Sequence, residues 1–261
     1  MDYASSISIV EILGGVVMKV VAFNASPKME KSNTSMILNP FIEGMKKAGA
    51  EVELFYTKKL KIKPCCGEFH CWIKTPGKCF QNDDMQMLYP KIREADIWVL
   101  GTPLYVDGIT GPIKNLLDRI LPFAEPSFEL RNGHCRHPVR KGIKRGKVVL
   151  ISNCGFWEVD NFDPMLAHVK AICKNADKEF VGALLRPHGG ALQPMIKMGI
   201  DIDDIFRAAY QAGFSLIQEG SIPAETLKIV SRPLLPLELY MQFVNTHFDQ
   251  ELATLNKEVS P

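Results

Sequence analysis

Continuous apolar runs alternate along the chain with segments in which apolar residues recur every three or four positions. The runs consist of β-branched and aliphatic residues and occur at 19–24, 51–56, 96–101, 147–152 and 179–186. Buried parallel strands have this pattern, because both faces of their sheet are covered. The periodic segments predict helices at about 32–48, 83–94, 111–121, 161–175 and 201–219. Five strand–helix units in strict alternation predict an α/β fold, a doubly wound parallel sheet with helices on both faces.

The two ends of the chain depart from this alternation. Residues 222–261 contain several prolines and then a helical pattern from 237 to about 255, which we interpret as a C-terminal helical appendage on the domain or on a partner subunit. Residues 1–17 include an apolar stretch but lack the basic start of a signal peptide. We interpret them as an N-terminal extension or a misplaced start codon. The expected division is therefore 1–17, 18–221 and 222–261.

Composition narrows the class of protein. The 261 residues are 46% hydrophobic, which suffices for a large buried core, and the net charge of +2 gives no reason to expect a nucleic acid partner. No apolar run reaches the roughly 18–20 residues that cross a bilayer, so no membrane association is expected. The seven cysteines form an odd set, and four of them crowd into 65–79, unlike a disulfide framework. This usage predicts a reducing, cytoplasmic location.

The first strand leads directly into Asn24-Ala25-Ser26-Pro27-Lys28 and, shortly after, into Ser32-Asn33-Thr34. A hydroxyl-rich turn at the start of a helix gathers backbone N–H groups and the positive end of the helix dipole, which suits a phosphate. The alternative is that Ser32 or Asn33 only caps the helix. The motifs G-x-x-x-x-G-K-[ST] and G-x-G-x-x-G are absent, so this segment alone leaves both interpretations open.

Two further loops are expected at the same edge of the sheet. The carboxyl ends of parallel strands lie together, so the loops at 24–34, 102–110 and 153–158 should form one site. The second loop combines glycines with Tyr105 and several aliphatic side chains, and such a loop can lie along a flat heterocycle. The alternative is an ordinary strand–helix loop in which Tyr105 packs.

These segments resemble the flavodoxin-like NAD(P)H-dependent FMN reductase family, especially its iron–sulfur flavoprotein branch. The matching pieces are 24–28 with 32–34, 101–105, 111–119, Cys71-Trp72 through Gly77-Lys78-Cys79, and Asp83-Asp84-Met85. The resemblance covers roughly residues 18–186. It implies an FMN cofactor, a flavodoxin-like five-stranded sheet of order 2-1-3-4-5, and a homodimer or homotetramer that closes over the flavin.

The resemblance also assigns residues to the flavin. The FMN phosphate is expected to contact Ser26, Lys28, Ser32, Asn33 and Thr34. One wall of the isoalloxazine ring is expected to consist of Pro103, Leu104, Tyr105, Val106 and Gly108. The far side is expected to be bordered by Asn153, Cys154 and Gly155, with Phe156 beside them. No catalytic acid or base is required, because the flavin carries the hydride and electron chemistry.

The cysteine segment departs from the iron–sulfur branch, which carries Cys-x-x-Cys-x-x-Cys and a fourth cysteine further on. With Cys65 and Cys71 in the first and third places, Glu68 stands at the second. A [4Fe–4S] cluster ordinarily takes four thiolates, so we expect no intact cluster. If one is present, its ligand set is Cys65, Cys66, Cys71 and Cys79. A zinc site that uses His70 is a further alternative.

The basic stretch 131–147 is interpreted as a solvated loop.

Three functions follow from these patterns. The first is an FMN-dependent oxidoreductase that accepts hydride from NAD(P)H and passes electrons to a quinone, a flavin or a protein. The second is a non-enzymatic electron carrier, with or without a [4Fe–4S] cluster. The third is a flavodoxin-shaped binding module without cofactor chemistry, which the intact loops at 26–34 and 101–111 argue against. The apolar residues of 222–255 are the expected contact with a neighbouring subunit.

Overall fold

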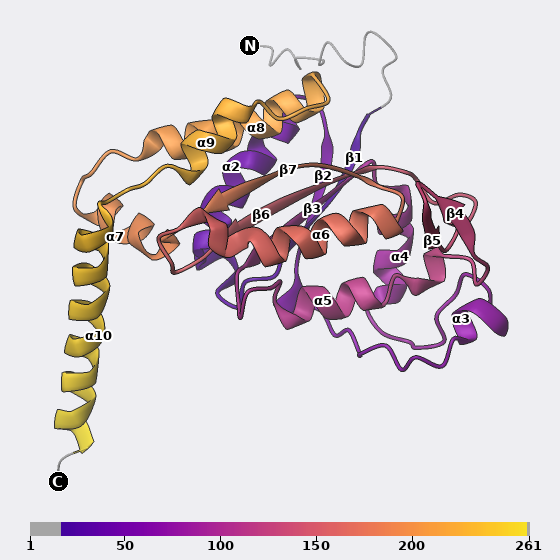
Figure 1. The fold of residues 1–261 in the computed structure, drawn as a ribbon, viewed down its shortest axis with the longest axis horizontal. Helices are drawn as coiled ribbons and strands as arrows, with labels where there is room; N and C mark the ends of the chain where they lie inside the picture. Colours follow the sequence, from indigo (N-terminus) through magenta and orange to yellow (C-terminus); the bar gives the residue numbers. More distant parts are fainter. Residues whose placement is uncertain (1–16, 260–261) are drawn as a thin grey trace, which may run out of the picture.

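A five-stranded parallel sheet forms the centre of the protein in a computed structural model that describes residues 17–259 (Figure 1). The strands are β1 (Lys19–Asn24), β2 (Glu51–Tyr56), β3 (Ile97–Pro103), β6 (Lys147–Asn153) and β7 (Glu179–Arg186). They lie in the order β2-β1-β3-β6-β7, which confirms the predicted order 2-1-3-4-5. The order reverses between β1 and β3, and ligands of such sheets bind beside the carboxyl ends at this point.

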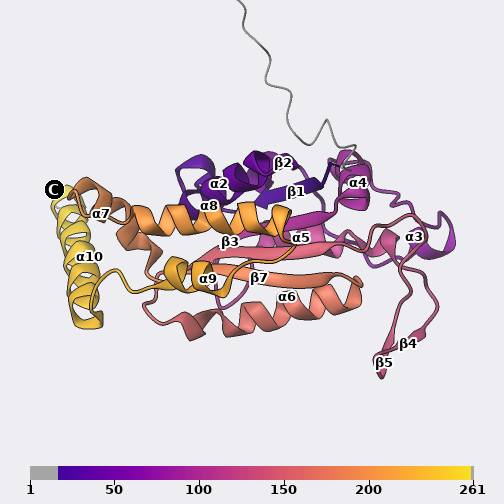
Figure 2. The same cartoon turned by 90° about the horizontal axis from the view of Figure 1, so that it is seen from above.

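Helices cover both faces of the sheet (Figure 2). One face packs against α2 (Asn33–Lys47), α8 (Asp203–Gln218) and α9 (Ala224–Ser231). The other packs against α4 (Met85–Glu94), α5 (Gly111–Asp118) and α6 (Asp163–Asn175). Alternate residues of β1 divide between the two layers, with Val20 and Ala22 in the first and Val21 and Phe23 in the second. Continuous apolar strands therefore arise because each strand has a buried side chain on both faces.

The first layer depends on a close approach of α2 and α8. A Cβ atom added to Gly44 would lie 2.0 Å from the backbone oxygen of Tyr210. One added to Gly213 would lie 2.0 Å from the backbone oxygen of Phe41. Glycine is the residue that lets these two helix backbones touch, and this contact fixes the position of α2, whose first turn belongs to the predicted phosphate site.

The C-terminal segment has two parts. Helix α9 packs on β7 and α8, and Val230 is buried in the core of the first layer. Helix α10 (Leu237–Val259) then projects away from the sheet (Figure 1). No helix within residues 17–259 is long and apolar enough to cross a membrane. The division at 17 and 221 stays a prediction, and residues 1–16 lie outside the described part of the chain.

Part of the stretch that we interpreted as a solvated loop forms a hairpin. Strands β4 (Glu129–Arg131) and β5 (His134–Arg136) pair antiparallel across Asn132 and Gly133. Both turn residues have positive φ, 51° and 75°, as a two-residue hairpin turn requires. The Asn-Gly dipeptide was therefore a sequence signal for this hairpin, but the surrounding run of basic residues obscured it. Two short helices, α3 (His70–Ile73) and α7 (Leu192–Lys197), complete the description.

Candidate functional site

The predicted phosphate loop folds around the first turn of α2. The backbone turns back on itself between β1 and α2, where Ser26 O accepts from Met29 N at 3.0 Å. Ser32 is the helix cap, since its hydroxyl accepts from the backbone N–H of Ser35 at 3.0 Å and lies 2.6 Å from Met29 O. The N–H groups of Asn33 and Thr34 open the helix, and the first residues of a helix have no acceptor within it. This arrangement favours backbone donors over the Ser32 hydroxyl as anion ligands.

Asn153 joins this loop to the end of β6. Its side-chain amide donates to the Thr34 hydroxyl at 2.6 Å, and both residues are buried. The Thr34 oxygen is therefore held in place at the start of α2, with its own proton free to donate. That Asn153 borders the far side of the ring stays a prediction, and the structure places its side chain against Thr34 of the predicted phosphate loop. A Cβ atom at Gly189 would lie 3.1 Å from that of Asn153, so the glycine leaves room for this orientation.

The loop after β3 contains a small hairpin of its own. Tyr105 and Gly108 exchange two backbone hydrogen bonds of 3.1 Å, with Val106 and Asp107 at the turn. Val106 has φ 48° and its side chain is 99% exposed. A β-branched residue in the left-handed region is strained, and such strain is concentrated at functional sites. The Tyr105 and Val106 side chains thus stand outside the core, and their role as a ligand wall stays a prediction.

Buried threonines connect this loop to the phosphate loop. The hydroxyl of Thr102 accepts from the backbone N–H of Thr110 at 3.2 Å. The hydroxyl of Thr110 donates to the backbone oxygen of Ala25 at 3.2 Å. The Thr110 hydroxyl therefore holds two of the three predicted loops together.

The loop after β6 presents Gly155 and Phe156 at the surface, whereas Cys154 is buried. Burial raises the pKa of the Cys154 thiol, which donates to the backbone oxygen of Phe156 at 3.3 Å. Cys154 therefore supports the loop as a neutral thiol. The backbone N–H of Leu104 donates to Asn153 O at 2.8 Å and ties this loop to the one after β3.

The sequence analysis missed a second support of this loop, which comes from the C-terminal segment. The Trp157 indole donates to the backbone oxygen of Leu235 at 2.8 Å, and the Tyr240 hydroxyl donates to that of Gly155. His188 stacks on Trp157, with ring centroids 6.1 Å apart. The Nε2 atom of His188 accepts from the backbone N–H of Leu234 at 2.9 Å. The segment that we expected to be an appendage therefore fixes one wall of the candidate site.

Arg186 and His188 occupy the centre of this contact, and both are fully buried. The Arg186 guanidinium donates to the backbone oxygens of Val230 at 2.7 Å and Arg232 at 2.6 Å. Burial, and then the nearby charge of Arg186, lower the pKa of His188 to about 4, so that its ring is neutral. The ring must be neutral for Nε2 to accept the hydrogen bond from the backbone N–H of Leu234. The sequence signal for this contact was the pair Arg186 and His188 at the carboxyl end of the last strand, at the same edge of the sheet as the other loops.

The four cysteines that we named as ligands in case a cluster is present do not all line one cavity. Within the described residues, no three His, Cys, Asp or Glu side chains lie close enough together to hold a metal ion. Cys65, Cys71 and Cys79 line a common small cavity of about 80 Å³, and Glu68 lines it with them. Cys66 does not line it, and its sulfur lies 3.5 Å from the amide nitrogen of Gln81. Cys66 is therefore a poor replacement for the missing second thiolate.

A buried ion pair holds the cysteine segment against α5. Arg119 and Asp83 are joined by two contacts of 2.6 and 3.2 Å, and Arg119 also donates to the backbone oxygen of Lys63. Burial alone would raise the pKa of Asp83, but the hydrogen bonds from Arg119 and from the backbone hold it below its usual range. A second guanidinium nitrogen lies 3.4 Å from the sulfur of Cys79. These contacts give a physical reason why the segments of Asp83 and Arg119 both occur among the pieces that carry the family resemblance.

The fold is that of a flavodoxin-like domain, and the three joined loops lie at the switch point of its sheet. Residues 18–155 match the family model described as NADPH-dependent FMN reductase, and the chain belongs to this family. An iron–sulfur flavoprotein of Archaeoglobus fulgidus is 38% identical over 129 residues, which cover 49% of this chain and 62% of the relative. Another, from Methanocaldococcus jannaschii, is 34% identical over 115 residues, which cover 44% of this chain and 58% of the relative. The match thus spans about three fifths of these curated relatives.

Solved structures share the fold at low sequence identity. An NAD(P)H:quinone oxidoreductase from Methanothermobacter marburgensis has a TM-score of 0.56 and 18% identity, covering 77% of this chain and 96% of that one. RosB, solved with a bound riboflavin-phosphate derivative, has a TM-score of 0.57 and 15% identity, covering 88% of each chain. These comparisons confirm the predicted flavodoxin-like fold, and the family match confirms the predicted FMN reductase family.

The buried neutral His188 predicts a loss of stability in acid. Its folded pKa of about 4 lies below the unfolded value of about 6.5, so the unfolded chain binds the additional proton between these pH values. Lowering the pH from 7 to 4.5 should therefore reduce the free energy of unfolding by up to about 3 kcal/mol through this group. In His188→Asn, which keeps an acceptor and tolerates the left-handed backbone at φ 39°, that contribution should vanish.

Urea unfolding at a series of pH values measures this difference. The exposed His247→Asn variant is the control and should keep the slope of the wild type. Equal pH slopes for the wild type and His188→Asn would show that the His188 ring does not titrate as its burial requires.

Proposed function

We propose that this protein is an FMN-dependent oxidoreductase that accepts hydride from NAD(P)H and passes electrons to a quinone, a flavin or a protein. The proposal rests on one observation. Three loops of this FMN reductase family member meet at the switch point of its sheet, and the Asn153–Thr34 and Thr110–Ala25 hydrogen bonds join them. Relatives named iron–sulfur flavoproteins and a structural neighbour named a quinone oxidoreductase support the same class of chemistry.

The phosphate end of the site fits an anion. The first N–H groups of α2 point out of a helix of fifteen residues, and the helix dipole adds a partial positive charge there. Thr34 and Ser26 provide buried hydroxyls, and exposed Lys28 provides a mobile positive charge beside them. We assign the phosphate to these groups and to the backbone of Asn33. Ser32 contributes by capping the helix.

The ring end of the site fits a flat apolar molecule. Tyr105, Val106 and Phe156 are exposed apolar side chains on two loops that a backbone hydrogen bond joins. Pro103, Leu104 and Gly108 would support the first wall, and Cys154 and Gly155 the second. Bound FMN supplies the hydride and electron chemistry, and these residues position the ring and keep water from one of its faces. The other face stays open for a nicotinamide.

The relatives are named iron–sulfur flavoproteins, and we keep an electron carrier with a [4Fe–4S] cluster as a second candidate. The chain's own residues favour the enzyme without a cluster. Glu68 stands where a thiolate is expected, and Cys66 does not line the cavity that the other three cysteines line, although its sulfur contacts Gln81 at the edge of that cavity. We therefore propose that no stoichiometric cluster forms, and that the cysteines remain reduced in a cytoplasmic protein.

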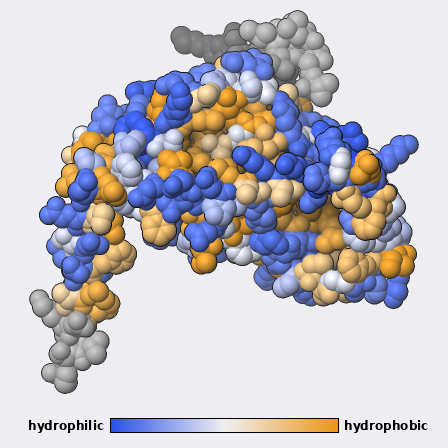
Figure 3. Space-filling view, viewed as in Figure 1, coloured by the Kyte–Doolittle hydropathy of each residue, from blue (hydrophilic) through white to orange (hydrophobic). Residues whose placement is uncertain are grey.

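Helix α10 supports a homodimer or homotetramer. Met241, Phe248, Leu252 and Leu255 are exposed and recur at helical spacing, so they form one apolar stripe. Figure 3 shows hydrophobic surface along this projecting helix. Its first turn already contacts the flavin loop through the Tyr240 hydroxyl. We propose that the stripe binds a second copy of the chain, which then covers the open face of the site.

The phosphate assignment predicts selective loss of FMN affinity in Thr34→Val. Removal of one hydroxyl donor to a charged group should weaken FMN binding about tenfold, since such a bond contributes roughly 1.5–3 kcal/mol. Riboflavin lacks the phosphate, so its affinity should stay unchanged. Thr226→Val removes a similarly buried hydroxyl, bonded to Pro223 O, and is the matched control. Flavin fluorescence titration measures the affinity of the wild type and of both variants for FMN and for riboflavin. Unchanged FMN affinity in Thr34→Val, or an equal loss for both flavins, would refute the assignment.

The cluster proposal predicts the visible spectrum of the protein. After anaerobic purification the spectrum should contain flavin bands without broad iron–sulfur absorbance, and iron and acid-labile sulfide should lie far below four per chain. NAD(P)H should bleach the flavin bands, and a quinone should restore them. Iron and sulfide near four per chain would contradict the proposal and would move the electron carrier ahead of the enzyme.

The apolar stripe predicts a change of assembly when it becomes charged. Phe248→Glu with Leu252→Glu should give a smaller assembly in analytical ultracentrifugation and weaker retention of flavin, because buried apolar area is lost and carboxylates cannot be desolvated at low cost. Thr246→Glu with Gln250→Glu adds the same charge on the opposite side of the helix and should keep the assembly of the wild type. A wild type that is monomeric and fully active would overturn this role of α10.

A further inference from the structure

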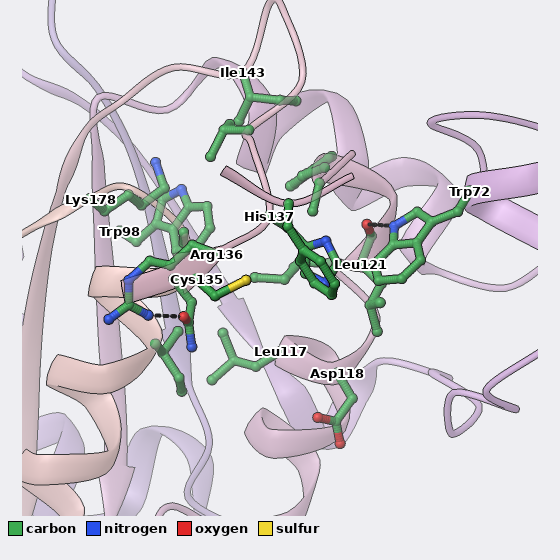
Figure 4. Close-up of a pocket in the computed structure, with 18 residues that line it drawn as sticks. Trp72, Trp98, Leu117, Asp118, Leu121, Cys135, Arg136, His137, Ile143 and Lys178 are labelled. Atoms are coloured by element: carbon green, nitrogen blue, oxygen red, sulfur yellow. Dashed lines mark hydrogen bonds between the residues drawn. The ribbon is translucent and has the colours of Figure 1, made fainter. Parts of the chain in front are cut away.

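An apolar cavity of about 460 Å³ lies at the amino edge of the sheet, far from the three flavin loops. It is enclosed by the C-terminal ends of α5 and α6 and by the segment that contains the β4–β5 hairpin (Figure 4). Trp98 in its wall is the second residue of β3, whereas the flavin loop begins at the other end of that strand, about 17 Å away at the usual rise per residue. The hollow is visible beside the hairpin in Figure 3.

We call this cavity the hairpin cavity. Its walls consist largely of aromatic and aliphatic side chains. At one end the Trp72 indole is fixed by a 3.0 Å hydrogen bond to the backbone oxygen of Leu121, and its ring centroid lies 4.7 Å from that of His137. Phe128 continues this aromatic group, 4.9 Å from His137. Trp98 forms the opposite end (Figure 4). Flat walls on two sides and a volume of this size suit a planar apolar molecule.

The cavity also contains a buried positive charge. Lys178 is only 8% exposed, and its ammonium group lies 4.1 Å from the centroid of the Trp98 ring. Its hydrogen-bond partner is the backbone oxygen of Lys144, at 2.9 Å. No carboxylate forms an ion pair with Lys178 within the described residues. A buried ammonium with a single backbone partner is costly, and burial lowers its pKa to about 8.

The acidic groups nearby are already paired with other cations. Asp118 lies 2.5 Å from Lys114, and Asp96 lies 2.7 Å from Lys144. Asp177 pairs with two arginines at the rim. Arg136 lines the cavity as well and hydrogen-bonds to the side chain of Asn175. The polar part of the cavity therefore carries an excess of positive charge next to an apolar interior.

We propose that the hairpin cavity binds a planar aromatic molecule with one anionic group, such as an aromatic carboxylate or sulfonate. The apolar body lies between Trp98 and the Trp72–His137 pair, and the anion faces Lys178. This site is separate from the flavin site and does not depend on the proposed oxidoreductase function. It gives the protein a second ligand, whose recognition needs both the apolar walls and the buried charge.

The probe for this proposal is 8-anilinonaphthalene-1-sulfonate, titrated into the full-length, flavin-loaded protein and followed by its fluorescence and by calorimetry. Saturable binding near one probe per chain is expected. Lys178→Met keeps most of the apolar stem and should weaken the probe about tenfold, as expected for loss of a charge-assisted contact. N-Phenyl-1-naphthylamine, which lacks the sulfonate, should bind both proteins equally. Lys174→Met removes an exposed lysine of α6 and should change neither affinity.

A second pair of variants keeps the test decisive if Lys178→Met folds poorly. Lys178→Arg retains the charge and should keep most of the sulfonate affinity. Val139→Phe fills the cavity and should abolish binding of both probes, while the apolar stripe of α10 remains available to them. Near-ultraviolet circular dichroism and FMN content, measured on each variant, report folding and the flavin site separately.

Three results would overturn the proposal. Sulfonate binding that neither Lys178→Met nor Val139→Phe alters would place the probe elsewhere, for example on α10. Equal losses of the charged and neutral probes in Lys178→Met would show that the ammonium does not recognise the anion. Probe affinity that falls as protein concentration rises would mean that a second copy of the chain occupies the cavity. A protein without FMN would refute the oxidoreductase function and leave these titrations interpretable.

Discussion

The candidate site depends on one constraint, which is that polar groups buried at the carboxyl edge of the sheet must find partners within the edge itself. Asn153 meets this requirement by donating to Thr34, and Thr110 meets it by donating to the backbone of Ala25. Each bond satisfies a buried donor, and each joins two loops that are far apart in the sequence. An unpaired group in their place would cost more than a hydrogen bond contributes. The loops are therefore held in position before any ligand arrives, which lowers the cost of ordering them around a flavin.

The C-terminal segment extends the same constraint to the third loop. Arg186 is buried without a carboxylate partner in the described ion pairs, and its charge is compensated by backbone oxygens at the C-terminal end of α9. His188 can accept from Leu234 only because its ring is neutral. The loop at 153–157 thus has its position fixed by a segment that comes last in the chain. An interface on α10 would act on the flavin wall through Tyr240 and Trp157, without any contact of its own with the ring.

Different edges of the sheet serve different kinds of recognition in this chain. The carboxyl edge offers strained backbone, hydroxyls and exposed apolar side chains, as at Val106. The amino edge is closed by the β4–β5 hairpin over aromatic walls and one buried ammonium, that of Lys178. The Arg119–Asp83 pair fixes the cysteine segment to the C-terminal end of α5. A helix of eight residues therefore contributes to both the flavin loop at its start and the hairpin cavity at its end.

The sequence by itself determined the α/β class, the strand order through its family resemblance, and the three loops of the site. Its apolar runs name the strands because burial on both faces leaves no alternation, and β1, β2 and β7 begin and end where those runs do. Only the tertiary structure decided that Ser32 is a cap, that Asn153 turns toward Thr34, and that Cys66 does not line the cavity of the other three cysteines. It alone revealed the contact of Arg186 and His188 with the C-terminal segment and the cavity around Lys178. The reason is physical: periodicity records which residues are buried, whereas the partner of a buried polar group is set by the folded chain and can lie far away in sequence, as Thr34 lies 119 positions from Asn153 and Val230 lies 44 from Arg186.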